Sequence, residues 1–108
     1  MSAFYELRRY QLQPGRRAEW VEYMETVIIP YQISRGMVVT ASFVDEEHPD
    51  IYFWMRRFES EEQREALYAA TYEHPTWQGE IGPKARAMMV EGANVITRLS
   101  PTPRSPVR

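Results

Sequence analysis

The stretch IYFWMRRF, residues Ile51 to Phe58, decides the fold of this 108-residue chain. It is rich in β-branched and aromatic residues, which favour a strand. Side chains alternate between the two faces of a strand, and here both alternating sets are bulky. This pattern is typical of a strand that is covered on both faces. We therefore expect Ile51–Phe58 to be a central strand with other elements packed on it.

A hairpin is expected before this strand and a helix after it. The segment DEEHPD, residues 45–50, is a charged turn, and MVVTASFV, residues 37–44, is rich in β-branched residues and predicts the partner strand. After the central strand, Ser60 and Gln63 have the spacing of a capping box, which predicts the start of a helix. The pair His74-Pro75 is expected to end that helix.

The remaining chain supplies two more strands and two more helical segments. We expect a strand over 4–12, and then a helix over 16–34 that Pro30 kinks or ends. A short helix over 83–91 and a strand over 94–99 follow. The order β-α-β-β-α-β predicts an α+β, ferredoxin-like fold, in which a four-stranded antiparallel sheet carries both helices on one face.

Residues 1–99 are expected to form one domain and residues 100–108 a tail. A chain of this length can bury enough surface to form its own core. The tail reads SPTPRSPVR, and its prolines lack the backbone N–H group that helices and central strands use. We therefore expect a flexible, proline-rich extension.

The sheet face opposite the helices is expected to be aromatic. We assign to it the side chains of Tyr10, Tyr52, Trp54, Phe58 and Ile96. That is more apolar area than a soluble monomer usually leaves in water. A second copy packed sheet-to-sheet would cover this face, so the sequence predicts a homodimer.

Composition argues against several classes of function. The chain has no cysteine, which excludes disulfides and thiolate chemistry, and its two histidines are too few for a histidine metal site. We expect no metal and no cofactor. The net charge of −2 argues against nucleic acid as a partner. With no apolar run near the ~20 residues of a membrane helix and no signal-like N-terminus, we expect a cytoplasmic protein without a membrane span.

Five residues of the first and third strands are candidates for a polar site. Glu6, Arg8 and Tyr10 share one face of the first strand, and Trp54 and Arg56 share one face of the third. The two strands are neighbours in this topology, so the five side chains are expected to meet. Two interpretations stay open. Either an arginine holds a carboxylate, phenolate or enolate in an aromatic cavity, or a buried Glu–Arg pair only orders the core.

His74 lies at the expected end of the second helix, near Trp77. It is a candidate general base, because imidazole titrates near neutral pH, and a candidate axial haem ligand. The alternative is a residue that stabilises the last helical turn through the helix dipole. His48 lies in the charged turn and is expected to be exposed to solvent.

Four motifs within residues 4–99 match a known family in order and spacing. They are Tyr5-Glu6-Leu7-Arg8-x-Tyr10 followed by Pro14-Gly15, Trp54-x-Arg56-x-Phe58, Ser60 with the helix that carries Arg64, and His74-Pro75-x-Trp77. The second motif has Phe where that family commonly has Tyr, and the last has His where an acid is usual. On these motifs the chain resembles the NIPSNAP family, a branch of the dimeric α+β barrel superfamily.

This resemblance implies the fold more firmly than the function. The superfamily includes cofactor-free monooxygenases, haem-degrading enzymes, dehydratases, muconolactone-type isomerases and proteins that only bind ligands. Animal NIPSNAP members are linked to vesicle transport and mitochondria, and many bacterial members have no assigned activity. With one domain and no transit peptide, the chain resembles the bacterial members.

Three hypotheses for function follow. The first is a homodimer that binds a small, largely apolar or aromatic ligand, and its pocket residues are expected to be Arg8, Tyr10, Trp54, Arg56 and Trp77. The second is a cofactor-independent monooxygenase, isomerase or cyclase for an aromatic or polyketide-like substrate. Its catalytic candidates are His74, Tyr10 and Glu6. The third is a scaffold that recruits a partner protein. Only the enzyme needs a titratable group beside the ligand.

Overall fold

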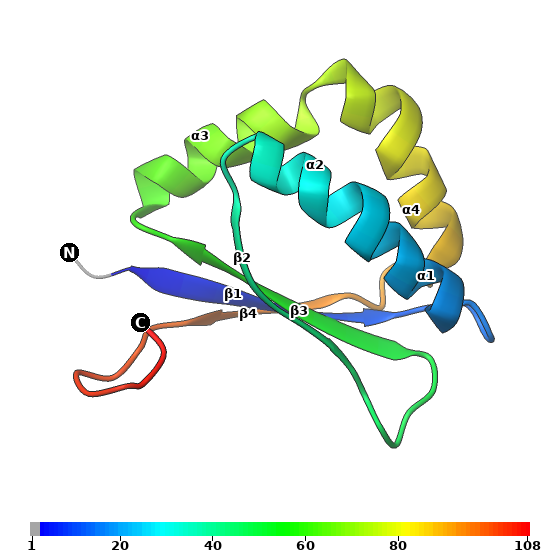
Figure 1. Cartoon of the computed structure of the whole chain (residues 1–108), viewed down its shortest axis with the longest axis horizontal. Coiled ribbons are helices and arrows are strands. Elements are labelled where there is room, and N and C mark those ends of the chain that lie inside the picture. The colour runs from blue at the N-terminus through cyan, green and yellow to red at the C-terminus, as the bar shows by residue number, and fades with distance from the viewer. Residues whose placement is uncertain (1–2) are drawn as a thin grey trace.

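A computed structural model describes residues 3–108, and it contains one four-stranded sheet with the helices on one side of it (Figure 1). In chain order the elements are β1 (Phe4–Gln11), α1 (Arg17–Tyr23), η1 (Met24–Ile28), α2 (Ile29–Ser34), β2 (Val38–Val44), β3 (Ile51–Phe58), α3 (Glu61–Tyr72), η2 (Trp77–Ile81), α4 (Gly82–Met88) and β4 (Val95–Leu99). The segments η1 and η2 are π-helical turns. Each of the four expected strands is present.

The sheet has the strand order β2-β3-β1-β4, and all neighbouring strands are antiparallel. The strand IYFWMRRF is therefore central, as the sequence predicts. In its register with β1, Glu6 lies opposite Arg56 and Tyr10 opposite Tyr52. This arrangement confirms the ferredoxin-like α+β fold. Within residues 3–108, no helix is long and apolar enough to cross a membrane.

Two of the three helical segments differ from the expectation: the first is less regular and the last is longer. The first continues from α1 through the π-helical turn η1 into α2, so Pro30 does not end it. A proline cannot donate the i→i−4 hydrogen bond of an α-helix, and the wider π-helical turn lies directly before it. The second expected helix starts at Ser60, whose hydroxyl accepts a hydrogen bond from the Gln63 backbone N–H. The short helix begins at Pro75, just before η2, rather than at residue 83.

The large aromatic residues of β1 and β3 face the helices, and their expected assignment to the opposite face is wrong. Tyr10, Tyr52, Trp54 and Phe58 are each at most 5% exposed. The first three pack in one cluster with residues of α1, η1 and α4, and Phe58 packs against α3. Ile96 lies opposite Arg8 and so belongs to the same face of the sheet, but it is on the edge strand β4 and is 50% exposed. Alternation along a strand separates its two faces without saying which face the helices cover.

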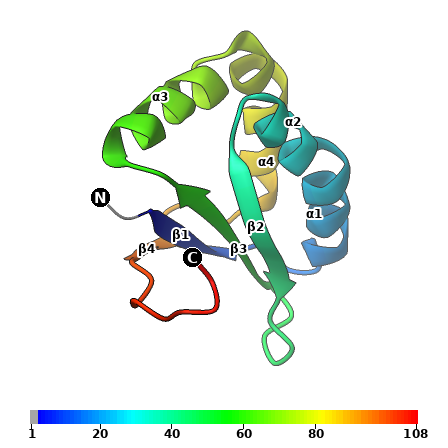
Figure 2. The same cartoon turned by 60° about the vertical axis from the view of Figure 1, so that its left-hand side comes forward.

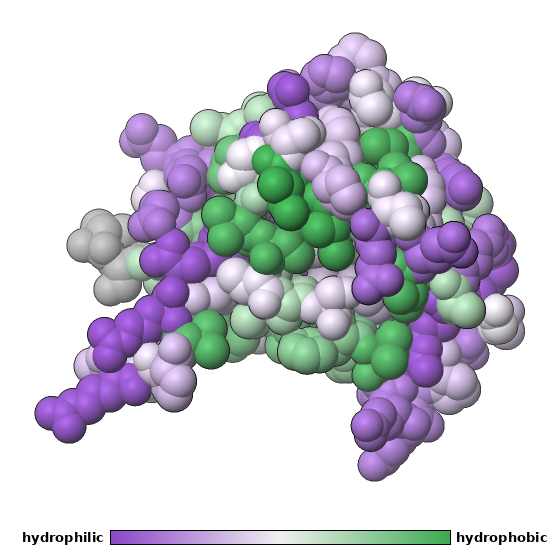
Figure 3. Space-filling model, viewed as in Figure 1, coloured by the Kyte–Doolittle hydropathy of each residue, from purple (hydrophilic) through white to green (hydrophobic). Residues whose placement is uncertain are grey.

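The face of the sheet away from the helices is also apolar, although less aromatic than expected. Phe43 and Phe53 lie opposite each other there, and so do Leu7 and Met55. Phe43 is 61% exposed. Val38 lies opposite Arg57 in the register of β2 and β3 and is 47% exposed. Hydrophobic side chains also gather on the surface beneath α2, on the helix side of the sheet (Figure 3). We call the side of the sheet away from the helices the open face.

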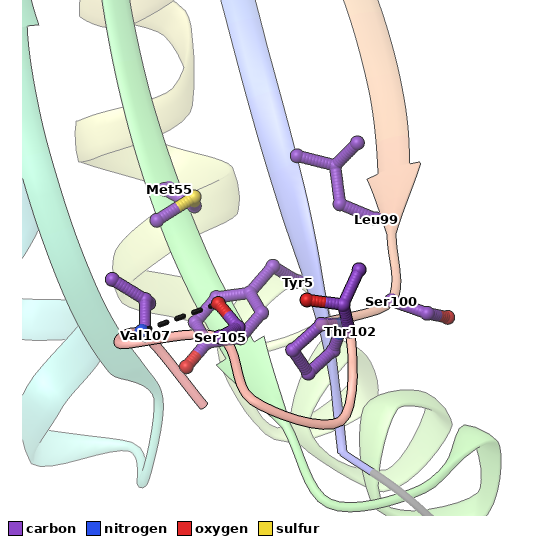
Figure 4. Close-up of a pocket in the computed structure, with 8 residues that line it drawn as sticks. Tyr5, Met55, Leu99, Ser100, Thr102, Ser105 and Val107 are labelled. Carbon is purple, nitrogen blue, oxygen red and sulfur yellow. Dashed lines mark hydrogen bonds between the residues drawn. The ribbon is translucent and has the colours of Figure 1, made fainter.

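The tail at residues 100–108 curls beneath one end of the open face (Figure 2). The side chain of Arg57 donates a hydrogen bond from Nε to the carbonyl oxygen of Arg108, at 3.0 Å. Tyr5 belongs to the open face but is only 4% exposed. Tyr5, Met55 and tail residues such as Val107 line a pocket of about 340 Å³ (Figure 4). The middle of the open face, around Phe53, lies outside this pocket.

Candidate functional site

A cavity of about 110 Å³ lies between the helices and the sheet. All three tryptophans of the chain line it, each from a different element: Trp20 from α1, Trp54 from β3 and Trp77 from η2. Its other lining residues are Arg8, Tyr10, Met24, Ile28, Tyr72, Gly82, Ala85, Arg86, Met89 and Asn94. We call this space the tryptophan cavity.

The two π-helical turns lie beside the tryptophan cavity. Met24 and Ile28 of η1 and Trp77 of η2 line it, so both irregular turns border the same space. A π-helical turn inserts an extra residue into a helix and is frequent at functional sites. The stacked rings of Tyr31 and Trp77, 6.1 Å apart, connect the two helical segments. The helical layer is therefore irregular where it borders the cavity.

A buried polar cluster lies next to the tryptophan cavity, and Arg56 is its centre. The Arg56 side chain is fully buried and donates to Glu6 from Nη2 at 3.1 Å. Nη2 also donates to the Tyr68 hydroxyl at 2.7 Å, and Nη1 donates to Gln32 at 2.9 Å and to the Tyr72 hydroxyl at 2.6 Å. The rings of Trp54, Phe58, Tyr68 and Tyr72 lie within 6 Å of its guanidinium carbon. A buried arginine needs such partners to offset the loss of water.

Glu6 is the carboxylate of this cluster, and it forms ion pairs with three arginines. Its oxygens lie 3.1 Å from Arg56, 2.6 Å from Arg64 and 3.7 Å from Arg8. Burial alone would raise the pKa of Glu6. Hydrogen bonds from Tyr68 and Arg64, and the charges of Arg56 and Arg64, outweigh burial and hold that pKa below its usual value. Glu6 is thus ionised at neutral pH, and burial raises the pKa of its neighbour Tyr68 to about 12, so that hydroxyl stays protonated.

Arg8 connects the buried cluster to the cavity. Its Nε donates to the Tyr10 hydroxyl at 2.7 Å and its Nη1 to the Tyr68 hydroxyl at 3.2 Å. Burial would lower the pKa of Arg8, but the surrounding tyrosines raise it above its usual value. Arg8 therefore carries a full positive charge beside the aromatic residues that line the tryptophan cavity.

The structure brings four of the five predicted pocket residues together. Arg8, Tyr10, Trp54 and Trp77 all line the tryptophan cavity, and Arg56 lies directly behind them in the buried cluster. Of the three catalytic candidates, only Tyr10 lines the cavity. Glu6 points into the cluster of arginines instead.

His74 lies outside the cavity lining. Its Nδ1 accepts a hydrogen bond from the Thr76 backbone N–H at 3.1 Å, and its ring packs edge-on against Tyr31. Among residues 3–108, no three His, Asp or Glu side chains lie close enough together to bind a metal ion. His48 is exposed in the β2–β3 turn, as expected.

The sequence-based prediction missed the residues of α3 that complete the cluster. Arg64, Tyr68 and Tyr72 are spaced four residues apart, so they share one face of that helix. The signal was therefore present in the sequence as a polar and aromatic stripe. Gln32 gave no comparable signal, because a single amide in a helix is usually exposed.

Gly82 sets how closely Trp77 lies against α4, and this closeness can be tested. A Cβ atom at Gly82 would lie 2.9 Å from both the indole nitrogen and the carbonyl oxygen of Trp77. We expect Gly82→Ala to lower the free energy of unfolding by about 1–3 kcal/mol, despite the helix preference of alanine. Gly79→Ala is the matched control, because a Cβ there meets nothing within 4 Å.

Chemical denaturation of both variants checks this expectation. Gly79→Ala should leave stability unchanged or raise it by up to about 1 kcal/mol. Equal stability of the two variants would contradict the close packing of Trp77 on α4.

Comparison with known proteins agrees with this architecture. A NIPSNAP family protein from Agrobacterium tumefaciens, described as having unknown function, is 24% identical, with a TM-score of 0.88 over 99% of this chain and 95% of that one. A NIPSNAP-like domain protein from Burkholderia xenovorans is 22% identical, with a TM-score of 0.85 over 96% and 89% of the two chains.

A more distant structural neighbour comes from Chloroflexus aurantiacus, and its proposed assignment is antibiotic biosynthesis monooxygenase. It is 19% identical, with a TM-score of 0.59 over 94% of each chain. At these identities the likeness shows the fold alone. No curated protein matches the chain. The NIPSNAP family model matches residues 5–106, nearly the whole sequence. The chain therefore belongs to the NIPSNAP family.

Proposed function

We propose that the protein is a homodimer that binds a small, largely apolar or aromatic ligand in the tryptophan cavity. The observation that carries this proposal is the convergence of all three tryptophans, from three elements, on one cavity. A ligand site is usually a concave space with an aromatic wall and a few placed polar groups. Arg8 and Tyr10 supply the polar groups here.

The size of the tryptophan cavity limits the ligand. An engineered protein cavity of about 150 Å³ holds benzene, so the tryptophan cavity, at about 110 Å³, has to widen for a whole aromatic ring to enter it. We place this widening at the π-helical turns on its helical side, because such turns interrupt the α-helical hydrogen-bond pattern and are frequent at functional sites.

Binding is favoured over catalysis by what lines the cavity. A general acid or base has to reach the ligand directly or through one water. His74 and Glu6 are both held elsewhere by hydrogen bonds to other groups, which leaves Tyr10 as the single candidate of the three. The Tyr10 hydroxyl accepts a hydrogen bond from Arg8, an arrangement that suits the positioning of a ligand.

The open face supports the proposed homodimer. Phe43, Phe53, Met55 and Leu7 share this face near its middle, and the tail residues pack at one end of it. Within residues 3–108, no helix covers it (Figure 1). A second copy would bury the same residues on both partners, as a two-fold interface does. The scaffold hypothesis would instead place a different protein on this face.

A filled cavity should no longer bind ligand, and α4 offers a matched pair of alanines for this test. Ala85 lines the tryptophan cavity and is 1% exposed, whereas Ala87 is exposed on the same helix. We expect benzene to change the tryptophan fluorescence of the unaltered protein in a saturable way. Ala85→Leu should abolish this response because its side chain fills the space, and Ala87→Leu should retain it.

The fluorescence titration is accompanied by circular dichroism to show that both variants are folded. Undiminished saturable binding by folded Ala85→Leu would contradict the proposed site, and so would the absence of any response in the unaltered protein.

The homodimer is tested by light scattering at low micromolar concentration. We expect twice the 12.8 kDa mass of one chain. Phe53→Glu places a charge in the middle of the open face and should give a folded monomer, because burying an unpaired carboxylate is costly. The control Gln78→Glu adds the same charge on the exposed side of η2 and should remain dimeric. A monomeric mass for the unaltered protein would contradict the dimer.

A further inference from the structure

We infer that the ligand of the tryptophan cavity carries a negative charge and that Arg8 binds this charge. The inference rests on the proposed function, because it assigns the chemical class of the ligand in the same cavity. The ligand class is a small aromatic carboxylate. Arg56, which the sequence also made a candidate anchor, does not line the cavity, and both of its terminal nitrogens already donate to other side chains.

The charges of the buried cluster do not balance. Arg8, Arg56 and Arg64 surround Glu6, which is the one carboxylate within 4 Å of Arg8 and Arg56 among residues 3–108. Arg64 has a second carboxylate partner in Glu61, 3.3 Å away near the surface. One carboxylate therefore remains for two arginines. Unpaired buried charge is costly, so an anion bound beside this cluster would be stabilised.

Glu6 is hydrogen-bonded to Arg56 but not to Arg8. The Glu6 oxygen nearest to both arginines already accepts from Arg56 at 3.1 Å and from Tyr68 at 2.5 Å. The same oxygen is 3.7 Å from Arg8, beyond hydrogen-bond distance. Both hydrogen bonds of the Arg8 side chain go to uncharged tyrosine hydroxyls. Its hydrogen bonds leave from Nε and Nη1, and the side chain is 14% exposed, so Nη2 is left for water or a ligand.

Two further donors among the lining residues have no acceptor. The indole N–H groups of Trp20 and Trp54 are buried, and neither has a hydrogen-bond partner within the described residues 3–108. Both tryptophans line the cavity and are at most 2% exposed. No Asp or Glu is among the lining residues of the described chain, whereas Arg86 adds a second cation at the rim. A ligand rich in acceptor oxygens would complement this lining.

The shape of the cavity selects a carboxylate over inorganic phosphate. Guanidinium groups bind both anions, often with two parallel hydrogen bonds. Phosphate has no apolar part, so it would bury no apolar surface against the three indole rings. One aromatic ring with a carboxylate combines an apolar body for the indole rings with a charge for Arg8. We therefore choose benzoate as the probe and benzamide as its uncharged counterpart.

The experiment measures the affinities of benzoate, benzamide and inorganic phosphate from tryptophan fluorescence. We expect benzoate to bind about tenfold more tightly than benzamide, because charge-assisted hydrogen bonds are the stronger ones. Phosphate should give no saturable response. Equal affinities for benzoate and benzamide would overturn the charge inference and leave the proposed cavity intact. A saturable response to none of the three would contradict the proposed function itself.

Variants of Arg8 test whether this side chain binds the charge of the ligand. Arg8→Met keeps the apolar part of the side chain and should weaken benzoate about tenfold, with benzamide changed less than about twofold. Arg8→Lys should restore part of the benzoate affinity. Arg16→Met, which removes an exposed arginine paired with Glu19, is the matched control and should bind as the unaltered protein does. Unchanged benzoate affinity in folded Arg8→Met would overturn the inference. If Arg8→Met does not fold, the benzoate–benzamide comparison on the unaltered protein decides.

Discussion

The pairing of Glu6 with Arg56 across the two central strands is the interaction on which the rest of the structure depends. The two residues lie opposite each other in the β1–β3 register, and both are nearly inaccessible to water. Removing one partner of such a pair typically costs about 3–5 kcal/mol, because the other is left charged and buried. A slip of one residue between β1 and β3 would turn one of the two toward the opposite face. The pair therefore specifies the register as well as contributing to stability.

The pair also positions the layer above the sheet. The hydroxyls of Tyr68 and Tyr72 on α3, and the amide of Gln32 on α2, all bind Arg56. Both helical segments are thus attached to the same guanidinium. Farther along the sheet the helices are held by aromatic packing instead, and their π-helical turns border the tryptophan cavity. The buried polar cluster and the tryptophan cavity therefore lie side by side between the helices and the sheet, with Arg8 between them.

The sequence predicts much of this arrangement because its signals are local. The capping box at Ser60 and the strand IYFWMRRF lie where the pattern puts them, and the neighbouring positions of Glu6 and Arg56 follow from the topology. The sequence did not predict which face of the sheet the helices cover. Both faces carry apolar residues, and the alternation of side chains does not distinguish them. The π-helical turns were also missed. Both turns border the tryptophan cavity, and neither follows from the spacing of apolar residues along the sequence.

The central claim is that ligand binds between the helices and the sheet rather than beneath the tail, where the larger pocket around Tyr5 lies. A crystal structure of the protein soaked with 4-bromobenzoate, with the bromine located by anomalous scattering, tests this most directly. We predict bromine among Trp20, Trp54 and Trp77, with the carboxylate at Arg8. Bromine confined to the pocket between the tail and the open face would contradict it.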